Sequence, residues 1–451
     1  MFDTVLIANR GEIALRIQRA CHQLGLKSVM VYSQGDAGAA YLQHADQALC
    51  IGPAAPGQSY LAPTALLYAA HAAGAQAVHP GYGFLSENAH FSQAVSDAGM
   101  AFIGPNAACI RRMGDKVAAK QAMREAGVPC VPGPLGALPE SREGIESIAA
   151  DVGYPVIIKA AGGGGGRGMR VVHGAEELLQ AVSVTREEAR RAFGNPELYL
   201  EKFLGHPRHV EIQVLCDQHG NGVWLGSRDC SLQRRHQKVL EEAPAPGIDA
   251  QVLAQVGQRC VEACHLIGYH GVGTFEFLYE DGEFYFIEMN TRLQVEHPVT
   301  EMTTGIDIVE QQLRVALGER LSIGQATITT TGHALECRIN AEDPHTFIPT
   351  PGTVTRWDLP GGIGVRVDTH VTVGYKVPPY YDSMIAKLVT HGATREQAMA
   401  RMRTALAQFG VEGISTNLPL HRHILSDPAF VAGAVDIHHL QRWLNDRQAG
   451  S

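Results

Sequence analysis

Residues 274–298 constrain the fold most, because they form two strand-like runs joined by a tight turn. Polar and apolar residues alternate on both sides of Asp281-Gly282, a dipeptide that favours a two-residue β-hairpin turn. Successive side chains of a strand point to opposite faces, so the second run should have one polar face and one apolar face. The two predicted faces are Glu288, Asn290 and Arg292 against Tyr285, Ile287 and Met289.

The polar face of this hairpin has the composition of a magnesium site. Glu276 lies on the first strand, and with Glu288 and Asn290 it offers the hard oxygen ligands that Mg²⁺ prefers. A hairpin with one solvated face fits this stretch equally well. A two-residue turn would put Glu276 and Glu288 on opposite faces, so the metal interpretation requires a three-residue loop or a β-bulge.

A dense polar segment follows the hairpin. It places Arg292, Gln294, Glu296 and His297 directly before Pro298, and it is too polar for a core strand. An arginine that can bind an anion, beside a carboxylate that can act as a base, suits a small anionic substrate that carries a proton. We therefore expect a substrate of that kind here.

Length and composition define the class of protein. A chain of 451 residues predicts two or three domains. Its 45% hydrophobic and 18% charged residues are typical of a soluble globular protein, and its net charge of −9 argues against nucleic-acid or membrane-surface binding. No stretch reaches the roughly 18 apolar residues of a membrane span, and no signal peptide is expected. Nine cysteines without CxxC or zinc-like spacing predict reduced thiols in a cytoplasmic protein.

The first hundred residues predict a parallel sheet. A short apolar strand, a helix and a second strand form a βαβ unit, and further strand-like segments follow. Their predicted bounds are 3–9, 12–24, 27–32, 75–79 and 100–104. No GxGxxG motif supports dinucleotide binding. The loop 79–88, which contains Tyr82, is either a structured turn or a substrate-facing loop at the carboxyl end of a strand.

Five consecutive glycines, Gly162–Gly166, separate predicted strands at 154–159 and 169–172. Glycine costs about 1 kcal/mol per residue in a regular element, so the run indicates a need for bare backbone, usually to wrap N–H groups around phosphate. The order strand–glycines–strand differs from the strand–loop–helix order of a P-loop, and GxxxxGK[ST] is absent. A mobile hairpin lid over a nucleotide fits best, with a flexible tip as the alternative.

The middle of the chain adds two candidate binding segments. Glu201 lies on a predicted strand with a polar end, and this strand could hydrogen-bond an adenine edge through its backbone and Glu201. Residues 228–238, RDCSLQRRHQK, form the densest cationic run, and their excess of donors favours anion binding over the ordinary explanation of a solvated face. The surrounding elements are predicted as a helix at 174–193, strands at 198–204 and 209–214, and a helix at 249–267.

Two changes of composition divide the chain. A helix opens at Met113 and runs to about Ala126, and the Gly/Pro-rich stretch 126–134 predicts a domain boundary near there. After about Gly332, short strands with Gly/Pro turns predict a smaller α+β closing domain that contains a helix at 395–409.

Motifs spread from Leu6 to about His439 match one family. They are Lys116, Lys159, GGGGGRGMR, Glu201-Lys202, HVEIQV, RDCSLQRRHQK, EMNTRLQVEHPVTE and HALECRINAEDP. This set resembles biotin carboxylase, of the ATP-grasp superfamily. The resemblance implies an α/β and α+β architecture with an N-terminal Rossmann-like parallel sheet domain (1–114), an ATP-grasp domain (115–331) with a glycine-rich lid at about 131–203, and a smaller C-terminal α+β domain (332–446).

The resemblance implies ATP- and bicarbonate-dependent carboxylation of biotin at N1′ through carboxyphosphate. ATP would contact Lys116, Lys159, Gly164, Gly165, Gly166, Met169, Glu201, Lys202, Leu204, His209, Gln233, His236 and Leu278. Two Mg²⁺ (or Mn²⁺) ions would be held by Glu276, Glu288 and Asn290. Bicarbonate would be bound by Lys238, Arg292, Gln294 and the Val295 amide, with Glu296 as base, and biotin would contact Tyr82 and Arg338.

The resemblance also implies partners. The sequence has no Ala-Met-Lys-Met-like biotinylation site and no room for a carboxyltransferase, so biotin would arrive on a separate biotin carboxyl carrier protein and a carboxyltransferase subunit would use the product. Acetyl-CoA carboxylase is the expected assembly, with propionyl-CoA, pyruvate or urea as other acceptors. Arg19 and Arg366 match a patch through which bacterial relatives dimerise and favour a homodimer, whereas Gln23 and Ile363 depart from it.

Other interpretations stay open. A different ATP-grasp ligase that joins a carboxylate to an amine or thiol would keep the lid and the metals, but it gives no reason for the segment 292–296 or for Arg338. A regulatory subunit with a decayed nucleotide site is disfavoured by the intact charged residues. For Arg338, the alternative to a biotin contact is a salt bridge to Glu336 or Glu342.

Overall fold

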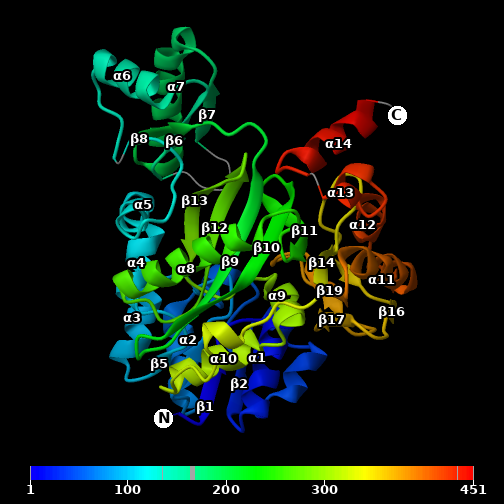
Figure 1. Ribbon diagram of the computed structural model, residues 1–451. Helices are drawn as coiled ribbons and strands as arrows, with labels where there is room; N and C mark the ends of the chain where they lie inside the picture. Colours follow the sequence, from blue (N-terminus) through cyan, green and yellow to red (C-terminus); the bar gives the residue numbers. More distant parts are fainter. Residues whose placement is uncertain (1, 135, 163–167, 434, 450–451) are drawn as a thin grey trace.

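The computed structural model describes residues 2–134, 136–162, 168–433 and 435–449, and its regions are arranged around one large sheet (Figure 1). The N-terminal region lies at one end of this sheet, and a small lobe projects from the other end. The C-terminal region packs alongside. The site described below lies where these regions meet.

The N-terminal region is a five-stranded sheet in the order β3-β2-β1-β4-β5, and all its neighbouring strands are parallel. The predicted parallel sheet is therefore confirmed. Its strands are β1 (Thr4–Ile7), β2 (Lys27–Tyr32), β3 (Gln47–Cys50), β4 (Ala77–His79) and β5 (Ala101–Phe102). Its helices are α1 (Gly11–Gln23), α2 (Pro63–Ala72), α3 (Ala89–Asp97) and α4 (Ala107–Gly114).

The predicted helix that ends near Ala126 is present, but it begins at Lys116 and not at Met113. The structure has α4 ending at Gly114 and a separate helix α5 (Lys116–Glu125). Asp115 between them has extended backbone, and its carboxylate accepts hydrogen bonds from the N–H groups of Val117 and Ala118. This is the geometry of a helix N-cap, which starts a new helix instead of continuing the old one.

The small lobe is a three-stranded sheet in the order β7-β6-β8 with two helices. Its elements are α6 (Arg142–Val152), β6 (Val156–Ala160), β7 (Met169–Val172), α7 (Ala175–Phe193) and β8 (Leu198–Lys202). Strands β6 and β7 are antiparallel, with Val156 opposite Val172, so the predicted strand–glycine–strand hairpin is confirmed. The predicted closure of its tip concerns residues 163–167, which lie outside the described residues.

The large sheet has eight strands in the order β13-β12-β9-β10-β11-β14-β19-β17, and all its neighbours are antiparallel. The strands are β9 (Arg208–Cys216), β10 (Gly222–Arg234), β11 (Gln237–Ala243), β12 (Gly271–Glu280), β13 (Glu283–Asn290), β14 (His333–Asn340), β17 (Val365–Thr369) and β19 (Met384–Gly392). Because β14 pairs with β11, the C-terminal region extends this sheet and does not form a detached cap.

The remaining helices cover this sheet and its edges (Figure 1). They are α8 (Ala250–Ile267), α9 (His297–Thr304), α10 (Ile308–Ala316), α11 (Arg395–Gln408), α12 (Leu418–Ile424), α13 (Pro428–Ala432) and α14 (His439–Ala449), of which α8 and α11 agree with the predicted bounds. Short strand pairs complete the C-terminal region: β15 (Gly352–Thr353) with β18 (Lys376–Val377), and β16 (Arg356–Asp358) with β20 (Gly410–Glu412). Within the described residues, no helix is both long and apolar enough to cross a lipid bilayer.

A shared hydrophobic core joins the two ends of the chain. It contains Ile13 of α1, Leu313 of α10, Leu388 of β19 and Met402 of α11, all of them buried. A second core lies between α8 and the large sheet, where a Cβ at Gly257 would come within 2.4 Å of the Trp224 ring. The first core fixes the N-terminal loops relative to the C-terminal strands, on opposite sides of the site.

Arg228 on β10 is a fully buried cation inside the large sheet. Its guanidinium donates to Glu211 on β9 at 3.0 Å, to Gln213 at 2.7 Å, and to the hydroxyls of Thr274 and Thr300 at 3.1 and 3.0 Å. A buried charge is tolerated only when it is paired and hydrogen-bonded in this way. Arg228 is therefore a structural residue, and the predicted anion-binding role of the run 228–238 is wrong for this position.

Replacing Arg228 by methionine should lower the free energy of unfolding by roughly 3–5 kcal/mol, because Glu211 would lose one of its buried cationic partners. Urea unfolding followed by circular dichroism measures this change. Arg142→Met, which removes an exposed pair with Glu146 on α6, is the control and should leave the unfolding midpoint unchanged. Equal midpoints for the wild-type and Arg228→Met proteins would contradict the structural role.

Candidate active site

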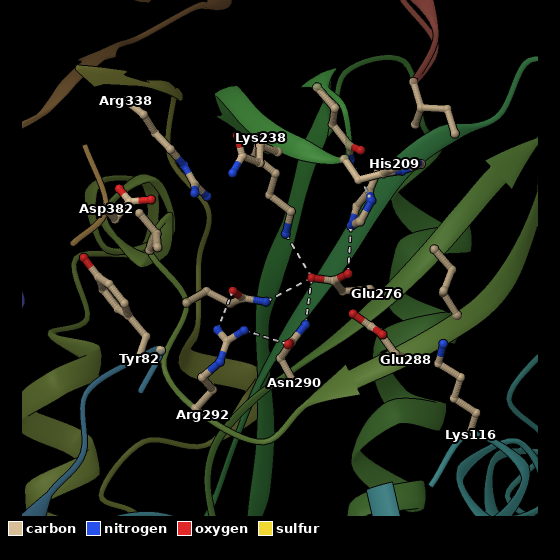
Figure 2. A pocket seen from close by; sticks show the side chains of 18 of the residues that line it. Tyr82, Lys116, His209, Lys238, Glu276, Glu288, Asn290, Arg292, Arg338 and Asp382 are labelled. Carbon is tan, nitrogen blue, oxygen red and sulfur yellow. Dashed lines mark hydrogen bonds and ion pairs between the residues drawn. The ribbon is translucent and has the colours of Figure 1, made fainter. Parts of the chain in front are cut away.

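A cavity of about 1190 Å³ lies between the large sheet, the small lobe and the N-terminal loops (Figure 2). It brings together the predicted residues Tyr82, Lys116, Lys159, Met169, Glu201, Lys202, Leu204, His209, Gln233, His236, Lys238, Glu276, Leu278, Glu288, Asn290, Arg292, Gln294, Val295 and Arg338. Glu296 lies just beneath the wall and is fully buried. Gly164, Gly165 and Gly166 fall outside the described residues.

The hairpin β12–β13 carries the bulge that the metal interpretation required. Glu280 pairs with Glu283 across a two-residue turn at Asp281-Gly282, both with positive φ. The register then shifts between Glu276 and Phe277, and this shift sets Glu276 directly opposite Glu288. The prediction that these carboxylates share a face is confirmed.

The same bulge makes one prediction of strand alternation wrong. Tyr285 and Ile287 were expected on the apolar face with Met289, yet both are only partly buried, and Ile287 borders the cavity beside Glu288. Phe284, Phe286 and Met289 occupy the hydrophobic core instead. An extra residue in one strand changes which side chains face the core beyond it, so simple alternation fails at the bulge.

Lys238 is the centre of the charge network. Its ammonium donates to Glu211, to Glu276 at 2.9 Å and to Glu296 at 2.8 Å. Burial alone would lower the pKa of Lys238, but the three carboxylates raise it well above its usual value. The lysine is therefore charged at any physiological pH and keeps the carboxylates around it ionised.

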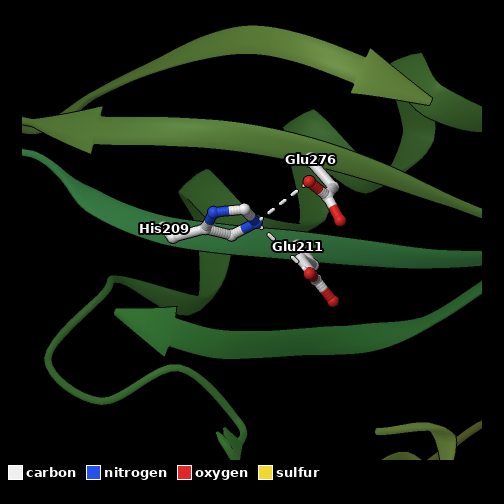
Figure 3. A group of neighbouring side chains, drawn as sticks. All are labelled: His209, Glu211 and Glu276. Atoms are coloured by element: carbon white, nitrogen blue, oxygen red, sulfur yellow. Dashed lines mark ion pairs between the residues drawn. The ribbon is translucent and has the colours of Figure 1, made fainter. Parts of the chain in front are cut away.

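His209 supplies a second counter-charge (Figure 3). Its Nε2 lies 3.2 Å from Glu211 and 3.3 Å from Glu276. Burial alone would lower the pKa of His209, but Glu276 and Glu211 raise it to about 9. The protonated ring pairs with both carboxylates, so this cluster of one histidine and two carboxylates is an ion-pair network in the structure.

Glu276, Glu288 and Asn290 fit a divalent cation. The Asn290 side-chain amide donates to Glu276 at 2.7 Å and orients it. The pKa of Glu288 is raised by burial and by the neighbouring carboxylates of Glu276 and Glu87. A cation between Glu276 and Glu288 would relieve this repulsion, and carboxylate and amide oxygens are the ligands that Mg²⁺ prefers.

Arg292 is oriented by a carboxylate from the N-terminal region. Its Nε donates to Glu87 at 2.9 Å, and its two terminal nitrogens donate to Gln294 at 2.8 Å and Asn290 at 2.9 Å. Glu87 also accepts from the Thr291 N–H at 3.1 Å. The arginine therefore presents its fork beside the carboxylates of the hairpin, as the predicted anion site requires.

Glu296 is held by a cation on each carboxylate oxygen. Lys238 donates to Oε1 at 2.8 Å, and the Nη2 of Arg338 donates to Oε2 at 2.9 Å. Burial alone would raise the pKa of Glu296, but Lys238 and Arg338 lower it. The alternative prediction, a salt bridge from Arg338 to Glu336 or Glu342, is wrong. Arg338 pairs with Glu241 and Glu296 instead.

The lysines at the lobe end of the cavity surround Glu201. Lys120 donates to one oxygen of Glu201 at 2.8 Å, and Lys159 donates to the other at 2.6 Å. Lys116 lies at the same end of the cavity as Glu288 in Figure 2, and burial lowers its pKa. These ammonium groups can neutralise phosphate oxygens.

Sequence reasoning missed several residues of the site. Glu211 was the easiest of them to predict from the sequence. His209, Glu211 and Gln213 point to the same face of one predicted strand, and that strand could have been paired with the hairpin. Glu87 and Glu241 had no local signal, since their partners are distant in sequence. Within RDCSLQRRHQK, Gln233, His236 and Lys238 line the cavity, whereas Arg234 lies over the Phe347 ring at 3.6 Å.

Fold and site together define an ATP-grasp ligase, with an antiparallel sheet, a strand–glycine–strand hairpin and a cavity lined by lysines and paired carboxylates. Three family models match the chain: "Biotin carboxylase, N-terminal domain" at residues 1–110, "Carbamoyl-phosphate synthase L chain, ATP binding domain" at 115–324, and "Biotin carboxylase C-terminal domain" at 336–442. Biotin carboxylase of Pseudomonas aeruginosa is 61% identical over 98% of this chain and 99% of its own.

Solved structures agree. A biotin carboxylase complex from Campylobacter jejuni superposes with a TM-score of 0.93 at 47% identity, covering 98% of this chain and 99% of that one. The biotin carboxylase domain dimer of the Hydrogenobacter thermophilus 2-oxoglutarate carboxylase, in complex with MgADP, ADP and bicarbonate, gives 0.91 at 46% identity and covers 98% of both chains. The protein belongs to the biotin carboxylase family of ATP-dependent ligases.

Replacing Glu288 by glutamine should raise the Mg²⁺ concentration needed for half-maximal ATP cleavage by about tenfold or more, because one ligand charge is removed. Phosphate release titrated with MgCl₂ at fixed ATP measures this. Glu283→Gln, on the same hairpin at the exposed turn, is the control and should not change the titration. An unshifted titration for Glu288→Gln would exclude this carboxylate as a ligand.

Proposed function

We propose that the protein carboxylates biotin at N1′ through carboxyphosphate, with the nucleotide at one end of the cavity and biotin at the other. The observation that carries this proposal is the position of Glu296. One of its oxygens accepts a hydrogen bond from Lys238, beside the paired carboxylates, and the other accepts one from Arg338. A base between these two cations can serve a substrate that reacts first with ATP and then with biotin.

The lobe end of the cavity is suited to ATP. Lys116, Lys159 and His236 would neutralise phosphate oxygens of ATP. The adenine ring would be surrounded by Glu201, Lys202, Leu204 and Leu278. Glu276, Glu288 and Asn290 would hold two Mg²⁺ (or Mn²⁺) ions, whose chemistry is to neutralise the equatorial oxygens of the transferred phosphoryl group.

Bicarbonate would bind to Arg292, Gln294, Lys238 and the Val295 N–H. Glu296 removes its proton, and the resulting dianion attacks the γ-phosphate to form carboxyphosphate and ADP. The lowered pKa of Glu296 keeps it ionised before the substrate arrives. When Lys238 and Arg338 turn toward the substrates, Glu296 loses its counter-charges and its pKa rises, so it can hold the proton.

Biotin would occupy the end that contains Tyr82, Asp382 and Arg338 (Figure 2). Carboxyphosphate breaks down to CO₂ and phosphate, and phosphate accepts the N1′ proton. The ureido oxygen then carries enolate charge, which the guanidinium of Arg338 stabilises because it remains charged and presents a planar set of donors. The nitrogen attacks CO₂ and forms carboxybiotin.

The wider assembly follows from the same proposal. Biotin would arrive on a biotin carboxyl carrier protein, and a carboxyltransferase subunit would pass the carboxyl group on, with acetyl-CoA as the acceptor. One similar structure comes from a 2-oxoglutarate carboxylase, so the choice of acetyl-CoA is a separate part of the proposal. A homodimer would form through the hollow lined by Arg19, Gln23 and Arg366, near the exposed Ile363. We propose domains at 1–114, 115–331 (lid 131–203) and 332–446.

ATP cleavage by the purified protein should require bicarbonate and should increase when free biotin is added. Phosphate release measured with neither, one or both additions tests this. Cleavage that ignores bicarbonate but responds to an amine or thiol acceptor would indicate a different ATP-grasp ligase. No cleavage under any condition would indicate a regulatory subunit.

Arg338→Ala should lower biotin carboxylation by roughly 10²–10³-fold, because the enolate loses its main donor. Bicarbonate-dependent ATP cleavage should be retained better, since carboxyphosphate forms before biotin reacts. Glu296→Ala should lose both activities. Carboxylation is measured by incorporation of ¹⁴C-bicarbonate and cleavage by phosphate release.

Arg356→Ala is the matched control for the arginine substitution. Arg356 is exposed and pairs with Asp358 and Glu412 on β16 and β20, away from the cavity. This variant should behave as wild type in both assays. Equal loss of both activities in Arg338→Ala, with an unchanged unfolding midpoint, would refute the division of roles between Arg338 and Glu296.

A further inference from the structure

The guanidinium of Arg338 is held on two edges by carboxylates from different elements. Its Nε donates to Glu241 on β11 at 2.5 Å, and its Nη2 donates to Glu296 at 2.9 Å. Within the described part of the chain, its remaining nitrogen, Nη1, makes no hydrogen bond. Arg338 lines the cavity on the side of Tyr82 and Asp382, so the open edge is the one available to a ligand (Figure 2).

The two carboxylates that hold Arg338 are not equivalent. Glu296 is shared with Lys238 and is the proposed base, so it must release Arg338 when it takes a proton. Glu241 is fully buried, and Arg338 is its hydrogen-bond partner, while its second oxygen has no partner among the described residues. Once Glu296 is neutralised, Glu241 is the anchor that remains.

The backbone around this contact is fixed on both strands. Glu241 on β11 lies directly opposite Glu336 on β14. Glu336 is two residues from Arg338 on β14, so both side chains point to the same face of that strand. The carbonyl of Arg338 accepts hydrogen bonds from Asn417 at 2.9 Å and His421 at 2.8 Å. With its backbone fixed, Arg338 can change the direction of its guanidinium only through its side chain.

Burial of Glu241 carries a cost that packing alone would not justify. Burial raises the pKa of Glu241 to about 7, although Arg338 acts against this. An apolar side chain in the same place would avoid that cost. The facing Glu336 is equally buried but, within the described residues, neither of its carboxylate oxygens accepts a hydrogen bond. Of the charges near Glu336, that of Lys387 acts on it most, whereas Glu241 accepts a hydrogen bond from Arg338.

We propose that Glu241 is a positioning residue for the biotin half of the reaction, which holds Arg338 aimed at the ureido oxygen after Glu296 has left its other edge. This rests on the role of Arg338 in the proposed function. If Arg338 contacts the ureido oxygen mainly in the transition state, loss of that contact lowers kcat and leaves the KM for biotin nearly unchanged. A misplacement of about 1 Å at such a group can cost a hundredfold in rate.

The test compares Glu241→Met, which removes the acceptor at similar length, with Glu241→Gln, which keeps an oxygen for the Nε of Arg338. We expect Glu241→Met to lower kcat for carboxylation of free biotin by roughly ten- to a hundredfold, with little change in KM. Glu241→Gln should recover most of this loss. Bicarbonate-dependent ATP cleavage without biotin should stay close to the wild-type rate in both variants.

Glu336→Met is the matched control, since it makes the same substitution at the facing buried position and should leave carboxylation close to wild type. The proposal is overturned if Glu241→Met carboxylates biotin like wild type, if Glu241→Gln loses as much as Glu241→Met, or if Glu336→Met loses equally. Arg338→Ala is measured alongside. If that variant keeps full carboxylation, the proposed role of Arg338 fails, whatever Glu241→Met shows.

Discussion

The ammonium of Lys238 is the interaction on which the rest of the site depends. It joins Glu211 on β9, Glu276 on β12 and Glu296 in the segment after β13, three carboxylates that repel one another when no cation is near. Arg228 and His209 complete the balance from either side of Glu211. Three ionised carboxylates can therefore coexist in one buried cluster, as the proposed metal and base roles require.

Much of this arrangement could be predicted from local sequence. The Asp281-Gly282 turn, the two strands around the glycine run and the first βαβ unit all depend on residues close to one another, and each was found. The carboxylate pair Glu276 and Glu288 was also predicted, on the condition of a three-residue loop or a bulge, and the structure has the bulge. In these segments the side-chain period and the turn chemistry determine the structure without help from distant residues.

The parts that could not be predicted depend on pairing between distant segments. Nothing near β14 shows that it adds to the sheet beside β11, and this pairing is what brings Arg338 to Glu241. The buried role of Arg228 was hidden because its partners lie on three other elements, so the cationic run looked available to ligands. Charge in a sequence predicts a binding surface only where no distant carboxylate neutralises it.

The central claim is that Glu296 and its cations prepare bicarbonate to attack ATP before biotin takes part. Oxygen transfer tests this most directly: the protein is given ATP, Mg²⁺, biotin and bicarbonate labelled with ¹⁸O, and the released phosphate is examined by mass spectrometry. If bicarbonate attacks the γ-phosphate, one of its oxygens stays in each phosphate when carboxyphosphate breaks down. Phosphate that contains no bicarbonate oxygen, under conditions where biotin is carboxylated, would contradict the account.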